Sequence, residues 1–139
     1  MDTSNAAFRF TVRNLQLTKG LIVYEDQQIK NHIELDDLNL DIPLISWDSR
    51  QSNMGINFRL GERGEVEISA EVDNQNKRYT ILLNTKTLSI SPMKDYLKDF
   101  LAVNSFDGLL TSKIKIMGEF EQAMNLSVSG NVIVDSLLI

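Results

Sequence analysis

Hydrophobic and polar residues alternate along most of the chain. The runs at residues 8–17, 33–44, 56–60 and 66–72 place an apolar side chain at nearly every second position. A period of two is the pattern of a β-strand with one buried and one solvated face. Polar turn sequences separate the runs, as at residues 61–64 and 73–76. The pattern predicts a mainly β chain of about eight or nine antiparallel strands, in a curled sheet or an open barrel or groove.

The alternation changes phase at two places. It slips by one residue at Asn14 and again across Asp36 and Asp37. A slip of one residue sends the following side chains to the opposite face of a strand. We therefore expect a β-bulge or a bend at each of these positions.

One segment departs from the period of two. Ser91 and Pro92 suit a helix start, because serine caps helices and proline tolerates the first helical position. Apolar residues then recur at three-and-four spacing as far as Leu101. We expect one short amphipathic helix over about 92–103. Its polar face carries two lysines and two aspartates, which does not suit a membrane-surface helix, so we expect it to close the open end of the sheet.

Length and composition narrow the function classes. The chain has 139 residues, of which 42% are hydrophobic and 24% charged, which is typical of one folded domain over 1–139. It has no cysteine, which excludes a disulfide framework and thiolate chemistry. Fourteen basic residues against nineteen acidic ones give a net charge of −5, the wrong sign for nucleic-acid binding. The strand pattern continues to Ile139, so we expect an excised segment of a longer protein.

The residues that could do chemistry form no motif. The only histidine, His32, has no second type of metal ligand beside it. The acidic run at residues 34–41 lacks the glycine of a calcium loop, and the glutamates at residues 65–71 are typical of a solvated strand face. Trp47 is expected at the edge of the core. We predict no enzyme activity, no metal and no cofactor.

The order of these elements resembles a known family. An acidic turn at residues 23–26 precedes a long amphipathic strand at 33–42. A helix start at 88–92 is followed by a glycine turn at 106–108, and a Ser-Gly-x-Val strand at 126–134 closes the order. In these features the chain resembles the AsmA-like family of bacterial envelope proteins over nearly its whole length.

The resemblance implies a function and a location. AsmA-like proteins are long periplasmic chains, usually tethered to the inner membrane of Gram-negative bacteria by one N-terminal helix. Their β-rich units form an apolar groove that carries phospholipid toward the outer membrane or assists outer-membrane assembly. The implied partners of this chain are phospholipid, or another apolar ligand, and adjacent β repeats of a membrane-tethered parent protein, without nucleic acid. The family offers no catalytic residue to carry over.

Three alternating sets are candidates for the lining of such a groove. They are Ile56, Phe58 and Leu60; Val66, Ile68 and Val72; and Ile114 and Ile116. The same alternation also fits a closed soluble β-barrel or sandwich that binds a small apolar ligand or a protein partner. The two alternatives differ in whether the apolar face of the sheet is a ligand surface or ordinary core.

Overall fold

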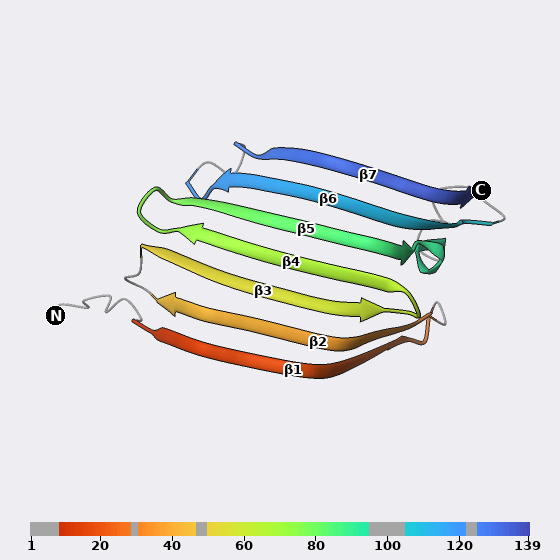
Figure 1. Ribbon diagram of the computed structural model, residues 1–139, viewed down its shortest axis with the longest axis horizontal. Helices are drawn as coiled ribbons and strands as arrows, with labels where there is room; N and C mark the ends of the chain where they lie inside the picture. Colours follow the sequence, from red (N-terminus) through yellow and green to blue (C-terminus); the bar gives the residue numbers. More distant parts are fainter. Residues whose placement is uncertain (1–8, 29–30, 47–49, 95–104, 122–124) are drawn as a thin grey trace.

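The computed structural model contains seven β-strands and one short 3-10 helix (Figure 1). It describes residues 9–28, 31–46, 50–94, 105–121 and 125–139. The elements are β1 (Thr11–Asp26), β2 (Asn31–Ser46), β3 (Gln51–Leu60), β4 (Gly64–Asp73), β5 (Arg78–Ser89), η1 (Ser91–Met93), β6 (Asp107–Glu119) and β7 (Ser127–Leu138).

All seven strands belong to one antiparallel sheet. Their spatial order is their order in the sequence, so each strand pairs with the strands before and after it. β1 and β7 form the two edges, at the bottom and the top of Figure 1. The predicted fold class is confirmed as a mainly β, antiparallel, open sheet. A closed barrel would require β1 to pair with β7, and these strands are not paired.

The strands are fewer and longer than the eight or nine predicted. Gly20, a residue type that often separates strands, lies inside β1. Thr87 lies inside β5 and has a positive φ of 46°. At both positions the pairing shifts and then continues. A bulge interrupts the alternation of side chains without ending the strand, so it imitates a turn in the sequence.

One of the two predicted irregularities is a register shift and the other is not. The shift at Asp36 and Asp37 is confirmed: the β2–β3 pairing slips there, and Asp37 has a φ of 49°. Asn14 also has a left-handed φ of 52°, but the β1–β2 pairing stays in register across it. The register shifts of β1 lie on both sides of Gly20 instead. The preceding residue, Lys19, has a left-handed φ of 53°. A single sequence does not reveal which strand of a pair contains the extra residue.

The helix prediction is tested only at its start. Ser91–Met93 form the 3-10 turn η1, with proline in its first turn as expected. Ser91 does not cap the turn: Ile90 occupies the N-cap position, and no side chain makes a capping hydrogen bond. The rest of the predicted helix, 95–103, lies outside the described residues, as does Trp47.

The sheet contains very little core. Among the described residues, the only buried apolar side chains are those of Val66 and Ile90, which are 7% and 6% exposed. The accessible surface of the chain is 10722 Å². A compact monomer of 15.8 kDa exposes about 7,300 Å². The chain therefore exposes far more surface than a closed domain of its mass.

Asp73 organises the hairpin between β4 and β5. Its Oδ1 accepts hydrogen bonds from the backbone N–H groups of Gln75 and Asn76, each at 3.0 Å, and its Oδ2 accepts one from Asn76 Nδ2 at 2.7 Å. These donors stabilise the carboxylate, and the Asn76 backbone N–H contributes most to lowering the pKa of Asp73 below its usual 3.8. The predicted polar turn at residues 73–76 is thus held by one ionised side chain.

We expect the hairpin to lose stability in acid through Asp73. A carboxyl whose pKa is lower in the folded state stabilises that state above the unfolded pKa and loses the effect as pH falls through the folded pKa. Titration of the Asp73 carboxyl by NMR is expected to give a pKa below 3.8. The Asn76→Ala variant, which loses the side-chain donor, is expected to raise it. An Asp73 pKa at or above 3.8 in the wild-type chain would contradict this account.

Gly130 allows β7 to lie close to β6. Its φ is +149°, and a Cβ at this position would collide with the Lys113 carbonyl and the Ile114 backbone. Gly55 in β3 is the opposite case, because a Cβ there would meet no atom within 4 Å.

Gly130→Ala is therefore expected to destabilise the chain by about 1–3 kcal/mol, through strain and loss of β6–β7 pairing. The matched variant Gly55→Ala is expected to be neutral or slightly stabilising, because alanine restricts the unfolded chain without a clash. Urea unfolding of the two variants measures the difference. Equal effects would show that the close approach at Gly130 is not needed.

Candidate functional site

One unbroken row of apolar residues crosses the whole sheet. Each member pairs with the next across a strand boundary: Leu17, Leu40, Ile56, Ile68, Leu83, Ile114 and finally Gly130. Paired residues of an antiparallel sheet project their side chains to the same face. The row therefore defines one face of the sheet, from one edge to the other.

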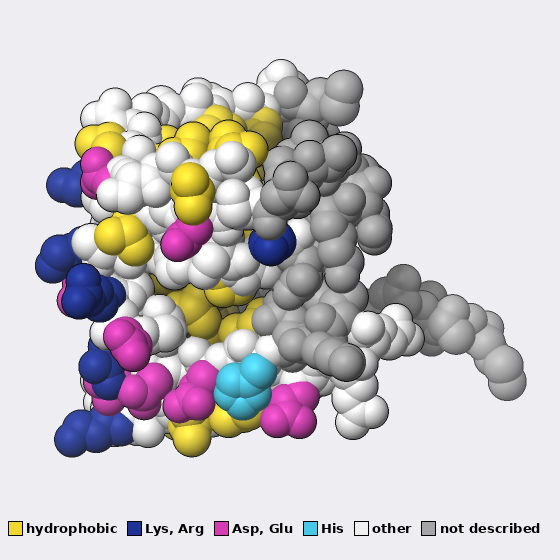
Figure 2. All heavy atoms as spheres, turned by 90° about the vertical axis from the view of Figure 1, so that its right-hand side faces the viewer, with side chains coloured by type: hydrophobic (Ala, Val, Ile, Leu, Met, Phe, Trp, Pro, Cys, Tyr) yellow, Lys and Arg dark blue, Asp and Glu magenta, His cyan; other side chains and the backbone are white. Residues whose placement is uncertain are grey.

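Neighbouring rows extend this surface, which we call the apolar face. One row contains Phe58, Val66, Thr85, Ser112 and Val132, and a second contains Met54, Ala70, Ile81, Ile116 and Val128. Leu60, Val72 and Tyr79 lie on it too. All eight residues proposed from the sequence as groove lining are on this one face. Figure 2, which looks at the ends of the strands, shows hydrophobic side chains in a central recess and most Lys and Arg side chains along the left-hand border.

Most side chains of the apolar face are half-buried, and those near the edges are exposed. Leu17 is 44% exposed, while Val128 and Val132 are 60% and 59% exposed. The described residues form a single sheet, so none of them provides a second layer over the face. Large exposed apolar surfaces of proteins commonly mark binding sites.

Two hydroxyl groups interrupt the apolar face at its centre. Thr85 Oγ1 and Ser112 Oγ lie 2.8 Å apart on paired strands, and both residues are buried. One hydroxyl donates to the other, which lowers the cost of burying the pair. The pair is not predictable from the sequence, because its members are 27 residues apart and neither belongs to a motif.

The opposite face carries a polar row directly behind the apolar one. It runs from Asn39 through Asn57, Glu67, Asn84 and Lys113 to Asn131. Each member is one residue away from a member of the apolar row. The sequence contains these residues in its alternation, but the cross-strand row follows only from the register.

A ladder of charges lies beside the polar row. Arg59 reaches Asp36 Oδ2 with Nη2 at 2.6 Å and Asp37 Oδ2 with Nε at 3.0 Å. Lys86 Nζ lies 3.4 Å from Glu65 Oε2 on the neighbouring strand. These side chains are about half-exposed or more, so each pair contributes at most about 1 kcal/mol. Their main effect is to keep this face polar.

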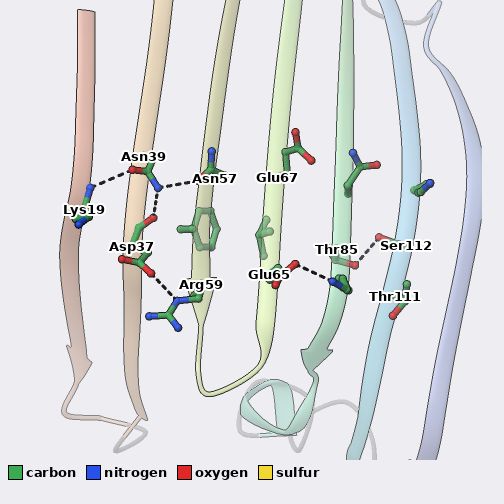
Figure 3. A pocket seen from close by; sticks show the side chains of 15 residues that line it. Lys19, Asp37, Asn39, Asn57, Arg59, Glu65, Glu67, Thr85, Thr111 and Ser112 are labelled. Carbon is green, nitrogen blue, oxygen red and sulfur yellow. Dashed lines mark hydrogen bonds and ion pairs between the residues drawn. The ribbon is translucent and has the colours of Figure 1, made fainter.

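Asn39 connects three strands at the bulges (Figure 3). Its Oδ1 accepts a hydrogen bond from the Lys19 backbone N–H at 3.2 Å, and its Nδ2 donates to the Asp37 carbonyl at 2.6 Å. Nδ2 also lies 2.9 Å from Asn57 Oδ1 on β3. Lys19 and Asp37 are the two left-handed residues of the bulges in β1 and β2. The Asn39 side chain therefore satisfies backbone groups that regular strand pairing would otherwise satisfy.

A hollow of about 810 Å³ lies at this part of the sheet. Its lining includes Asn57, Glu67, Asn84 and Lys113 of the polar row, together with Arg59 and Lys86. Figure 3 shows the labelled side chains at successive strands around it. The lining combines amides with charges of both signs and includes one aromatic residue, Phe58. The arrangement offers hydrogen-bond donors, hydrogen-bond acceptors and charges of both signs for polar contacts.

His32 lies at the other end of β2, close to two glutamates. Its Nδ1 is 3.5 Å from Glu25 Oε1 and its Nε2 is 3.7 Å from Glu34 Oε2, and all three side chains are exposed. No group of three potential metal ligands is found within the described ranges. In the same part of the chain, no helix has the length and hydrophobicity to cross a membrane.

Comparison with known proteins identifies no relative. The chain matches no protein-family model, no curated protein and no solved structure.

We expect Asn39→Ala to destabilise the sheet by about 1–3 kcal/mol, because it leaves the Lys19 N–H and the Asp37 carbonyl without their side-chain partner. Asn84→Ala removes the same side chain from the same polar row, and no hydrogen bond of the Asn84 side chain is found among the described residues. That control is expected to change stability by less than about 0.5 kcal/mol. Urea unfolding compares the two, and equal losses would contradict the role assigned to Asn39.

Proposed function

We propose that this chain is a non-enzymatic β-groove segment of an AsmA-like envelope protein, with the apolar face as its lipid-binding surface. In this proposal the parent protein is tethered to the inner membrane and the segment acts in the periplasm. It takes part in phospholipid transport to the outer membrane or in outer-membrane assembly. The observation that carries the proposal is the apolar row that crosses all seven strands with no second layer among the described residues.

The dimensions of the row agree with an acyl chain as the occupant. Six strand-to-strand steps of about 4.8 Å give a row about 29 Å wide. The hydrocarbon of one membrane leaflet is about 15 Å thick, so an extended acyl chain fits within the row. Each methylene group transferred from water to such a surface contributes about 0.8 kcal/mol of favourable binding free energy. About ten such groups therefore give strong binding, before the entropy cost of ordering the acyl chain is subtracted.

The exposed surface supports the same conclusion. The apolar face includes side chains that are largely exposed, such as those of Val128 and Val132, which are 60% and 59% exposed. A lipid, unlike a small polar ligand, covers an elongated apolar surface without needing hydrogen bonds from it.

The proposal predicts that lipid accompanies the chain. Native mass spectrometry and lipid extraction of the chain purified from a bacterial host are expected to give phospholipid at a reproducible ratio. Ile116→Asp introduces a charge on the apolar face and is expected to reduce this ratio at least fivefold. Met117→Asp is the matched control, because Met117 is the next residue along β6, points to the opposite face and is 38% exposed.

Circular dichroism of each variant separates lost binding from lost folding. Ile68→Asp provides a second test on β4 if Ile116→Asp does not fold. A wild-type chain that is stable and free of lipid would contradict the proposal and favour a module that binds a protein partner or small apolar ligand. Equal lipid loss in Ile116→Asp and Met117→Asp would also contradict it.

A further inference from the structure

The two edges of the sheet differ in their ability to accept another strand. Along β1, Asn14 and Lys19 have left-handed φ values and the pairing with β2 shifts on both sides of Gly20. The strand also carries Arg13, Lys19 and Glu25. Bulges and charged residues, lysine above all, are the features that keep an edge from pairing. β1 is therefore a protected edge.

β7 lacks this protection over most of its length. From Met117↔Ser127 to Leu109↔Asp135 it pairs with β6 residue for residue, with no register shift. Asp135 is its only charged residue, it contains no proline, and every residue of the strand is exposed. The outer side of a regular edge strand presents a row of N–H and C=O groups, and an extended polypeptide strand is the ligand that matches such a row.

The sequence of β7 is complementary to itself. An antiparallel copy centred on Asn131, the middle of the regular run 127–135, brings Val128 opposite Val134 and Gly130 opposite Val132 on the apolar face. On the polar face Asn131 faces its own copy and Asp135 faces Ser127. No two like charges are directly opposed, and each apolar residue of the apolar face meets an apolar residue or glycine.

We propose that β7 pairs with β7 of a second copy of this chain, in antiparallel register about a two-fold axis at Asn131. The axis is perpendicular to the sheet, so the two apolar faces lie on the same side and form one surface. Figure 1 shows β7 as the outermost strand with its outer side open. This assembly does not require lipid binding.

Opposite charges at Asn131 test the pairing. In homodimers of Asn131→Asp or of Asn131→Lys, like charges face each other across the axis, and each variant is expected to dimerise at least fivefold more weakly than wild type. An equimolar mixture of the two is expected to regain dimers, which contain one chain of each kind. Analytical ultracentrifugation at low ionic strength gives the association constants, and native mass spectrometry gives the composition.

Asn84→Asp and Asn84→Lys are the matched controls. Asn84 is in the same polar row, but it lies in the interior strand β5, so these variants are expected to dimerise like wild type. A wild-type chain that remains monomeric at about 100 μM would overturn the proposal. Weakening by the Asn84 variants equal to that by the Asn131 variants, or no recovery in the mixture, would overturn it as well.

A cysteine at the axis provides an independent test. The chain has no cysteine, so Asn131→Cys introduces a single thiol that meets its copy at the spacing of directly opposed strand residues, which a disulfide spans. Mild oxidation is expected to crosslink this variant at least tenfold faster than Gln16→Cys on the β1 edge. Equal rates would contradict the register. Asn131 is on the polar face, so failure here leaves the lipid measurement on the apolar face intact.

Discussion

The need to cover one face of a single-layer sheet governs the rest of this molecule. A sheet with strict alternation has an apolar face that must be removed from water by some other layer. Among the described residues only Val66 and Ile90 are buried apolar side chains, and none of these residues forms a second layer over the row from Leu17 to Gly130. Hydrophobic burial is the main favourable contribution to folding, so whatever covers this face contributes to the stability of the sheet.

On the polar face, hydrogen bonds and ion pairs between side chains connect neighbouring strands. Asn39 satisfies backbone groups at the bulges of β1 and β2, and Arg59 ties the Asp36–Asp37 bulge to β3. These contacts are local and mostly exposed, so individually they contribute little. Together they fix where the strands shift relative to each other. The bulges therefore keep the apolar row continuous although the alternation in the sequence is interrupted.

The lipid proposal and the assembly proposal use different parts of the sheet. The first depends on side chains of the apolar face, and the second on the backbone groups of β7 and on the polar-face residue Asn131. Both follow from an open sheet, because closing it would bury the apolar face and remove the free edge together. Of the two edges only β7 offers a regular run of unshifted residues, so pairing through β7 leaves the protected β1 strands as the outer edges of the dimer.

The sequence by itself determined the strands and which residues share a face. Ile56 and Phe58, for example, could be assigned to the same face of their strand, because a period of two is local and survives in any register. The turns at residues 61–64 and 73–76 could also be predicted, because a turn sequence is local too. The strand number was overestimated because Gly20 and Thr87 resemble turns but form bulges.

Only the tertiary structure decided which residues of neighbouring strands lie opposite each other. The Thr85–Ser112 pair, the contacts of Asn39 and the polar row from Asn39 to Asn131 join residues that are distant in the sequence. Whether the sheet closes is decided in the same way, by the pairing of β1 and β7. Register is a property of two strands together, and side-chain periodicity in one strand fits several registers equally well.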